Sequence, residues 1–284
     1  MPDAQHTAVL RYYAGTRWDY KHLWRSEQTL AIHFGYYDDS ATTHRQALAR
    51  MNAVLASCAR IDAADVVLDA GCGMGGSALW LAEHVGCPVL GINITAHQLQ
   101  SARSAARQRR LDHLARFEAR DYTSTGLPAA DFSVVWALES VVHAASKAEF
   151  AAEAFRLLRP GGRLVLAEYL VRDHPVLTAA ETEILRQWLD GWAMPSLLSE
   201  PDYRSVLGAA GFGPVRVWDI TDRVRPSLAR LDRITSALLP FAAALRSCRV
   251  IGRGHLENAR ACLAQLDALD RGLWRYKLLV AEKT

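Results

Sequence analysis

Lysine is scarce in this chain of 284 residues, since only four of its 33 basic residues are lysines. No tract of a single charge sign stands out either, because the 33 basic and 30 acidic residues are interleaved and leave a formal net charge of +3. Proteins that bind nucleic acids usually concentrate their basic residues in a patch or stripe. The charge pattern therefore argues against a nucleic-acid partner.

Cysteine is also sparse, with five residues, an odd number, and no CxxC spacing. Neither a disulfide framework nor a structural zinc site is expected from this pattern, and we predict no metal. Free cysteines of this kind are typical of a reducing compartment, so we expect a cytoplasmic location.

Long apolar runs and targeting signals are missing as well. No segment has the roughly 18 unbroken apolar residues of a membrane helix. The first residues, MPDAQHTAVLRYY, contain Asp3 and lack the basic start and apolar core of a signal peptide. No GxxxxGK[ST] run is present, which excludes a P-loop. We therefore expect no membrane span and no secretory leader.

What the sequence does contain is an alternation of short apolar runs and amphipathic segments. The apolar runs indicate buried parallel strands at 66–70, 88–92, 132–137 and 163–171. The amphipathic segments indicate helices at 42–59, 77–85, 96–110 and 147–158. This order predicts an α/β fold with a doubly wound, mostly parallel sheet and helices on both faces.

The pattern changes after Pro175. Residues 178–193 and 225–269 read as mainly helical, and two strand-like segments are found at 215–219 and 274–281. We expect these helices to cap the carboxyl edge of the sheet, where doubly wound folds bind ligands. The predicted regions are an N-terminal helical lid (1–60), a cofactor-binding core (61–174), and cap insertions with the last strands (175–284).

A glycine-rich turn follows the first apolar strand, in the stretch VVLDAGCGMGG at 66–76. Glycine permits a sharp bend and a close approach of backbone to a ligand because it has no Cβ. The spacing is GxGxGG rather than the GxGxxG of dinucleotide-binding enzymes, and Asp69 stands two residues upstream. Taken alone, the stretch could be a core strand and turn that merely needs glycine.

Four motifs in consistent order resemble those of class I S-adenosylmethionine-dependent methyltransferases: VLDAGCGMGG, LGINITAHQ, ARDY and LRPGGRL. The resemblance covers roughly residues 60–172 and implies a seven-stranded Rossmann-like sheet with S-adenosylmethionine as cofactor. It also implies a set of cofactor-binding residues, namely Asp69, Gly71, Gly73, Asn93, Gln98, Asp121, Tyr122 and Leu138.

Within that set the resemblance assigns parts of the cofactor. Asp69, Gly71 and Gly73 would surround its amino-acid end, and Asp121 with Tyr122 would flank the adenine. Most relatives hold the ribose with an acidic residue after the second strand, where this chain has Asn93, followed by Gln98 in the next helix. An amide hydrogen-bonds a diol without the charge assistance of a carboxylate.

A narrower resemblance rests on IHFGYY, on LESVVHA at 138–144 and on AEY at 167–169. These segments are similar to those of the sterol C-methyltransferases, the tocopherol methyltransferases and bacterial natural-product methyltransferases. By that resemblance His33, Tyr36 and Tyr37 belong to a lid over the cofactor, and Glu139, His143 and Glu168 are catalytic residues that line the acceptor pocket. The alternative for each is structural, as a packed aromatic ring, a hydrogen-bonded core histidine or a paired carboxylate.

These features predict an S-adenosylmethionine-dependent methyltransferase that acts on a small hydrophobic molecule of secondary metabolism, isoprenoid-like or polycyclic. We lean towards methylation of a carbon atom in an alkene or prenyl chain, and O- or N-methylation of an aromatic or glycosylated compound is the alternative. A cyclase or binding protein on the same fold is a further alternative. A nicotinamide-dependent oxidoreductase is disfavoured by the glycine spacing. A homo-oligomer is compatible with the sequence.

Overall fold

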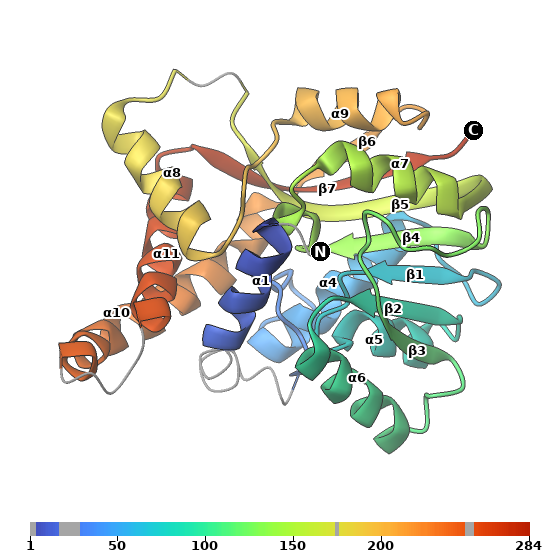
Figure 1. Cartoon of the computed structure of the whole chain (residues 1–284), viewed down its shortest axis with the longest axis horizontal. Coiled ribbons are helices and arrows are strands. Elements are labelled where there is room, and N and C mark those ends of the chain that lie inside the picture. Colours follow the sequence, from blue (N-terminus) through green and yellow to red (C-terminus); the bar gives the residue numbers. More distant parts are fainter. Residues whose placement is uncertain (1–3, 17–28, 174–175, 248–252) are drawn as a thin grey trace.

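The short apolar runs of the sequence form the centre of a seven-stranded sheet in the computed structural model of the chain (Figure 1). The structure describes residues 4–16, 29–173, 176–247 and 253–284. The strand order is β3-β2-β1-β4-β5-β7-β6, and β7 runs antiparallel to both of its neighbours. This confirms the predicted α/β class with a doubly wound, mostly parallel sheet.

The strands are, in chain order, β1 (Val67–Ala70), β2 (Val89–Asn93), β3 (Ala115–Ala119), β4 (Phe132–Leu138), β5 (Leu158–Val171), β6 (Arg216–Asp219) and β7 (Trp274–Glu282). The central strands are mainly apolar because helices cover both faces of the sheet. In β1, for example, Val67 packs into one apolar cluster and Leu68 into the other. The register is continuous, with Leu68 beside Leu90 of β2 and Val135 of β4.

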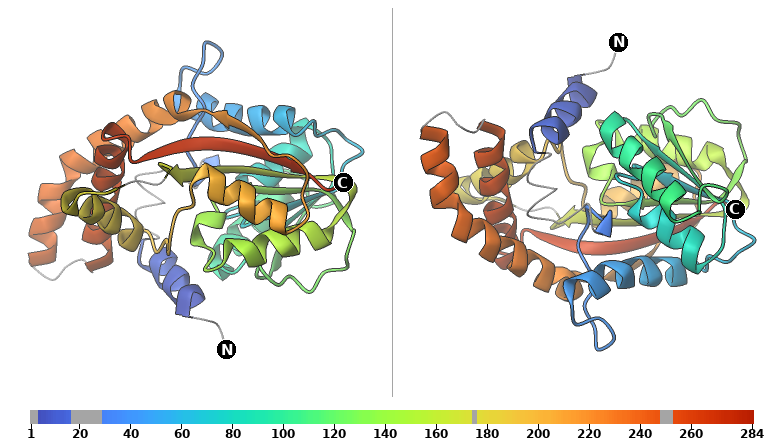
Figure 2. Two further views of the ribbon diagram at one scale, coloured as in Figure 1. Left: turned by 90° about the horizontal axis from the view of Figure 1, so that it is seen from above. Right: turned by 90° about the horizontal axis from the view of Figure 1, so that it is seen from below.

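The helices of the two faces come from different parts of the chain. One face carries α4 (His44–Cys58), α5 (Gly76–His84) and α6 (Ala96–Gln108), and the other carries α7 (Lys147–Leu157) and α9 (Glu200–Ala209). The remaining helical elements are α1 (Ala4–Gly15), η1 (Val141–His143), α8 (Ala179–Gly191), α10 (Thr221–Ser247) and α11 (Arg253–Asp270). Figure 2 shows helices on both sides of the sheet.

Helices α8, α10 and α11 gather beyond the carboxyl ends of the parallel strands, and α1 lies between them and the sheet (Figures 1 and 2). Their inward side chains, among them Trp188 and Leu228, are buried. The long strands β5 and β7 extend toward these helices and carry Tyr169, Trp274 and Tyr276 into the same apolar cluster.

The sequence patterns missed two elements and misplaced the start of a third. Strand β3 has charged residues at two of its five positions and lies at the sheet edge, so it lacks an apolar run. Helix α9 was also missed, although Ser199 and Asp202 form a capping box that marks its start. Strand β5 begins at Leu158 instead of the expected residue 163, and residues 159–162 form an irregularity within the strand.

Candidate active site

The bend after β1 contains three glycines that adopt a left-handed backbone conformation, two of which line the cavity described below. Gly71 has φ +86° and Gly73 has φ +52°. A Cβ on Gly71 would lie 2.5 Å from the Cβ of Ser140, so only glycine fits there. The bend leads directly into the first turn of α5, where free backbone N–H groups and the helix dipole favour negative charge.

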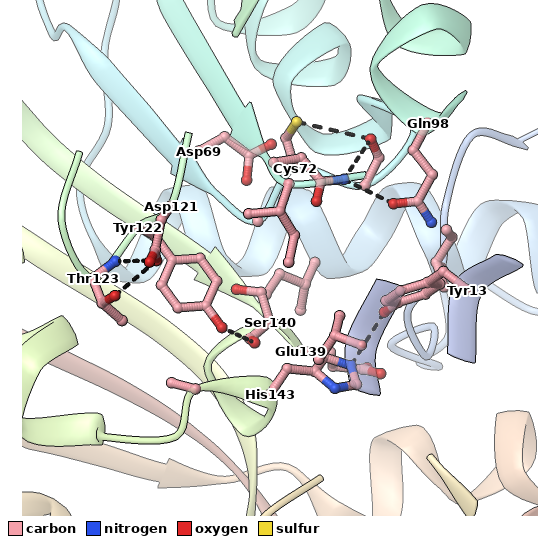
Figure 3. Close-up of a pocket in the computed structure, with 18 of the residues that line it drawn as sticks. Tyr13, Asp69, Cys72, Gln98, Asp121, Tyr122, Thr123, Glu139, Ser140 and His143 are labelled. Carbon is pink, nitrogen blue, oxygen red and sulfur yellow. Dashed lines mark hydrogen bonds between the residues drawn. The ribbon is translucent and has the colours of Figure 1, made fainter. Parts of the chain in front are cut away.

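Asp69 lies at the end of β1 and is withdrawn from water, with 3% of its surface exposed. Its Oδ2 has no hydrogen-bond partner. Burial raises the pKa of this carboxyl to about 7, although a hydrogen bond from the Ala78 backbone lowers it. In Figure 3 the carboxyl group faces the cavity. An unpaired carboxylate oxygen in such a place fits a cationic ligand group.

A cavity of about 1010 Å³ opens beside this bend. All eight residues expected to bind the cofactor line it: Asp69, Gly71, Gly73, Asn93, Gln98, Asp121, Tyr122 and Leu138. They come from the carboxyl ends of β1, β2 and β4, from the loop after β3 and from α6. Parallel strands that meet at one edge of the sheet bring these separate motifs together.

Two further sets of polar groups line this cavity. The Asn93 amide donates to Gln98 Oε1 at 2.7 Å, so the two amides form a hydrogen-bonded pair. One Asp121 oxygen accepts from the backbone N–H and the hydroxyl of Thr123, both at 2.8 Å. Its other oxygen lies 3.1 Å from Nε2 of His6 on α1.

The N-terminal aromatic segment is divided between the cavity and the core. His33 lines the cavity and is 5% exposed, its Nδ1 lies 2.8 Å from the Phe34 carbonyl, and its Nε2 has no partner. Burial lowers the pKa of this imidazole to about 4. The structure does not bring the two tyrosines to the cavity. Tyr36 packs under the Arg223 guanidinium, and the Tyr37 hydroxyl lies 3.0 Å from His44 Nδ1.

Glu139 lies just after β4 with a left-handed φ of +52°, and its carboxyl is held from three directions. Oε1 accepts from the Phe34 backbone N–H at 2.7 Å and from the Tyr276 hydroxyl at 2.6 Å, and Oε2 accepts from the Tyr169 hydroxyl. Desolvation raises the pKa of Glu139 to about 7, while these hydrogen bonds oppose the shift.

Glu168 was expected in the acceptor pocket, but it is fully buried within β5 and does not line the cavity. Its Oε1 accepts from the backbone N–H groups of Ser140 and Val141, at 3.1 and 2.9 Å. Burial raises the pKa of this carboxyl to about 8. The two hydrogen bonds hold the backbone between Glu139 and η1.

His143, at the end of η1, faces the cavity from the opposite side to Asp69 (Figure 3). Its Nε2 lies 3.1 Å from the Tyr13 hydroxyl and its Nδ1 lies 3.3 Å from the Ala193 carbonyl. A carbonyl only accepts, so this contact assigns the proton to Nδ1 and leaves Nε2 as an acceptor. Desolvation lowers the pKa of His143 to about 4, which keeps the ring neutral at pH 7.

Sequence reasoning missed the contribution of α1. Gln5, His6, Val9 and Tyr13 on this helix all line the cavity. The Gln5 side chain donates to the carbonyls of His143 at 3.1 Å and Ala193 at 2.8 Å. The only available signal was the helical spacing of Val9, Tyr12 and Tyr13, which does not reveal a partner about 130 residues away.

A second cavity of about 340 Å³ lies beside the first. We call it the aromatic chamber, and its lining residues are Tyr12, Tyr13, Ile32, Glu139, Val142, His143, Tyr169, Trp192 and Met194. Tyr13, Ile32, Glu139 and His143 line both cavities. The chamber is therefore next to the cofactor-size cavity, with His143 at the boundary.

Two kinds of feature are absent from the part of the chain that the structure describes. No group of three or more His, Cys, Asp or Glu side chains is arranged to hold a metal ion. No helix there has the length and apolar character needed to cross a membrane.

Comparison with known proteins agrees with this geometry. Residues 68–166 match the family model described as a methyltransferase domain. The 27-O-demethylrifamycin SV methyltransferase of Amycolatopsis mediterranei is 35% identical over 196 residues, which cover 69% of this chain and 71% of that protein. An S-adenosyl-L-methionine-dependent Diels-Alderase of Talaromyces variabilis is 30% identical over 99% of this chain and 96% of its own length.

Among solved structures, geranyl diphosphate C-methyltransferase from Streptomyces coelicolor superposes with a TM-score of 0.77 at 17% identity, covering 99% of this chain and 98% of that one. At that identity the likeness concerns the fold. The sequence similarity and the cavity together define the class: the chain belongs to the S-adenosylmethionine-dependent methyltransferase family. Its cofactor is S-adenosylmethionine.

Proposed function

We propose that the protein transfers a methyl group from S-adenosylmethionine to a hydroxyl oxygen of a small hydrophobic molecule in secondary metabolism. The observation that carries this proposal is the neutral imidazole of His143, whose Nε2 is an acceptor at the boundary of the two cavities. The Tyr13 hydroxyl lies 3.1 Å from this nitrogen, so a hydroxyl group can reach it. A general base has to lie within hydrogen-bond reach of the proton that it takes.

The cofactor-binding roles follow from the chemistry of the lining residues. Asp69, with its unpaired Oδ2, would accept from the α-ammonium group, next to the backbone of Gly71 and Gly73. The amides of Asn93 and Gln98 would hold the ribose hydroxyls. Asp121, Tyr122 and Leu138 would enclose the adenine, and His33 would close the cavity from the N-terminal segment.

When bound, S-adenosylmethionine supplies an electrophilic methyl group on a sulfonium, a leaving group that needs no protonation. The protein has to align the acceptor oxygen about 3–3.5 Å from that methyl carbon and exclude water. His143 Nε2 takes the hydroxyl proton as the oxygen–carbon bond forms and the carbon–sulfur bond breaks. Glu168 contributes by holding the backbone of Ser140 and Val141, which carries η1 and His143.

Oxygen is favoured over carbon because His143 places a neutral nitrogen acceptor at the boundary of the aromatic chamber, where it can take the proton of a hydroxyl group. The name of the Amycolatopsis relative also specifies an O-demethyl substrate.

A cyclase is the second candidate. The relative from Talaromyces is named a Diels-Alderase, although it is S-adenosyl-L-methionine-dependent and matches nearly the whole chain. A cyclase would use the aromatic chamber to hold a folded substrate and would need no base at His143. The two candidates therefore differ in the mass of the product.

The test is to incubate the protein with methyl-labelled S-adenosylmethionine and a panel of phenols, hydroxylated polyketides and prenylated alkenes. We expect labelled methyl ethers from hydroxylated compounds, identified by mass spectrometry and by the position of the label. Products with the methyl group on carbon would contradict the assignment of oxygen. Conversion without any gain of label would establish the cyclase instead.

A further inference from the structure

Almost every polar side-chain group on the wall of the aromatic chamber is already hydrogen-bonded. The Tyr12 hydroxyl donates to Asn258 Oδ1 at 3.2 Å, and the Tyr169 hydroxyl donates to Glu139. Tyr13 contacts His143 Nε2, and His143 Nδ1 contacts the Ala193 carbonyl. The side chains of Ile32, Val142 and Met194 have no group that requires a hydrogen-bond partner.

Trp192 is the exception on this wall. It follows the last residue of α8, is 7% exposed, and its indole N–H has no hydrogen-bond partner. Its ring is held by packing against Trp188, at a centroid distance of 6.2 Å, and against Tyr169, at 6.4 Å. A buried donor without a partner is unfavourable, and in a binding site a ligand can supply the missing acceptor.

We propose that the Trp192 indole N–H donates a hydrogen bond to an oxygen atom of the acceptor molecule, which therefore carries a carbonyl or similar oxygen in addition to the hydroxyl that is methylated. This inference rests on the proposed function, in which the aromatic chamber binds the acceptor. The indole N–H is a donor only, so it recognises an acceptor atom and gains nothing from a hydrocarbon. Oxygenated polycyclic compounds and polyketides fit this requirement, and pure hydrocarbon prenyl chains do not.

The experiment uses a matched pair of small ligands, 1-tetralone and tetralin, which differ by one ketone oxygen. The indole N–H signals of the eight tryptophans are recorded by NMR on protein labelled with ¹⁵N-tryptophan, in the presence of S-adenosylhomocysteine. W192F keeps an aromatic ring and removes the donor, so its missing signal identifies Trp192. W188F is the control, because the Trp188 N–H is also buried and unpartnered but does not line the chamber.

We expect 1-tetralone to move the Trp192 proton signal downfield, and tetralin to bind without that shift. W192F should weaken 1-tetralone binding about 2- to 12-fold, the range for one hydrogen bond, and leave tetralin binding unchanged. W188F should preserve the preference for the ketone.

The inference is overturned if no indole signal of the wild-type protein shifts with 1-tetralone while staying in place with tetralin. This comparison needs no variant. Equal weakening of both ligands in W192F would also overturn it, because that result would indicate lost packing. The experiment measures binding and not methyl transfer. A protein that binds the ketone through Trp192 but transfers no methyl group would therefore support this inference and count against the proposed function only.

Discussion

At the scale of single residues, the candidate site is built on groups that are unfavourable in the absence of a ligand. Asp69 is a buried carboxylate with an unpaired oxygen, and Glu139 and Ala193 have left-handed backbones, with φ +52° and +51°. Each costs folding free energy that the surrounding packing offsets. Stability and binding should therefore respond in opposite directions when such a residue is replaced.

Asp69→Asn tests this opposition. The variant removes a carboxylate whose pKa burial raises from 3.8 to about 7, so at pH 8 the free energy of unfolding of the ligand-free protein should rise by about 1–4 kcal/mol. Affinity for S-adenosylhomocysteine should fall roughly 10- to 100-fold, since a charge-assisted hydrogen bond is lost. Chemical denaturation and calorimetry measure the two effects. Asp131→Asn, at an exposed position, should change neither.

His143→Gln tests the proposed base. The variant keeps a polar side chain but cannot take a proton, so kcat should fall by about 10²- to 10⁴-fold. Affinity for S-adenosylhomocysteine, measured by calorimetry, should stay within the error of the wild type. A variant with unchanged kcat would assign His143 a structural role.

Glu168→Gln separates positioning from catalysis. Burial raises the pKa of Glu168 to about 8, so the group is mostly protonated at pH 7, and glutamine can accept the same two backbone N–H bonds. We expect the glutamine variant to keep most of its activity, and Glu168→Ala to lose stability and activity together. Steady-state kinetics and thermal unfolding give the comparison, and a large loss of kcat in the stable glutamine variant would contradict the positioning role.

At the scale of elements, α1 is attached to the site by polar contacts rather than by a large apolar face. Val9 is the one residue of this helix with a buried side chain, whereas Gln5, His6 and Tyr13 reach η1, Asp121 and His143. Such a helix is expected to open locally at a low free-energy cost. Residues that line the cavity should lose that freedom when a ligand fills it.

Hydrogen exchange measures this directly. Binding of S-adenosylhomocysteine should slow amide exchange in α1, because four of its side chains line the cavity. Helix α9 contributes no residue to the cavity and serves as the internal control, with its exchange unchanged. Equal protection of both helices would indicate a global stabilisation instead.

The elements also show what sequence can and cannot supply. Apolar runs such as Val67–Ala70 and the glycine bend after it are local patterns with local causes, and they predicted the central sheet and the cavity-lining residues. Strand β3 was missed because an edge strand needs no apolar run. The contact of Tyr13 with His143 and the wall formed by Trp192 are set by the packing of distant segments, which no local pattern encodes.

At the scale of the whole molecule, the buried titratable groups predict how stability depends on pH. Burial raises the pKa values of Asp69 and Glu139 to about 7 and of Glu168 to about 8, so their contributions are fully present below about pH 4 and are lost as pH rises through 7 to 8. Three histidines, one buried and two half-buried, have pKa values lowered to about 4 by desolvation. They contribute above about pH 6.5 and lose that contribution as pH falls: His33, His44 and His143.

The two sets oppose each other between about pH 4 and 6. Between about pH 6.5 and 8 the three acids outweigh Lys147, whose pKa burial lowers to about 8 and whose deprotonation acts in the opposite direction. The free energy of unfolding from urea titrations should therefore fall across the second range. Glu168→Gln should show a smaller fall, because one of the three acids is gone. Stability that rises from pH 6.5 to 8 would contradict the assignment of these burial effects.

The carboxyl group of Glu139 joins three parts of the chain that are synthesised far apart in time, since Phe34, Tyr169 and Tyr276 all donate to it. Strand β7, which carries Tyr276, inserts between β5 and β6. A nascent chain that has already formed β1 to β5 thus still lacks Tyr276, one of the three donors to this carboxyl. The hydrogen bonds of Glu139 are complete only after β7 has been synthesised and has paired with β5.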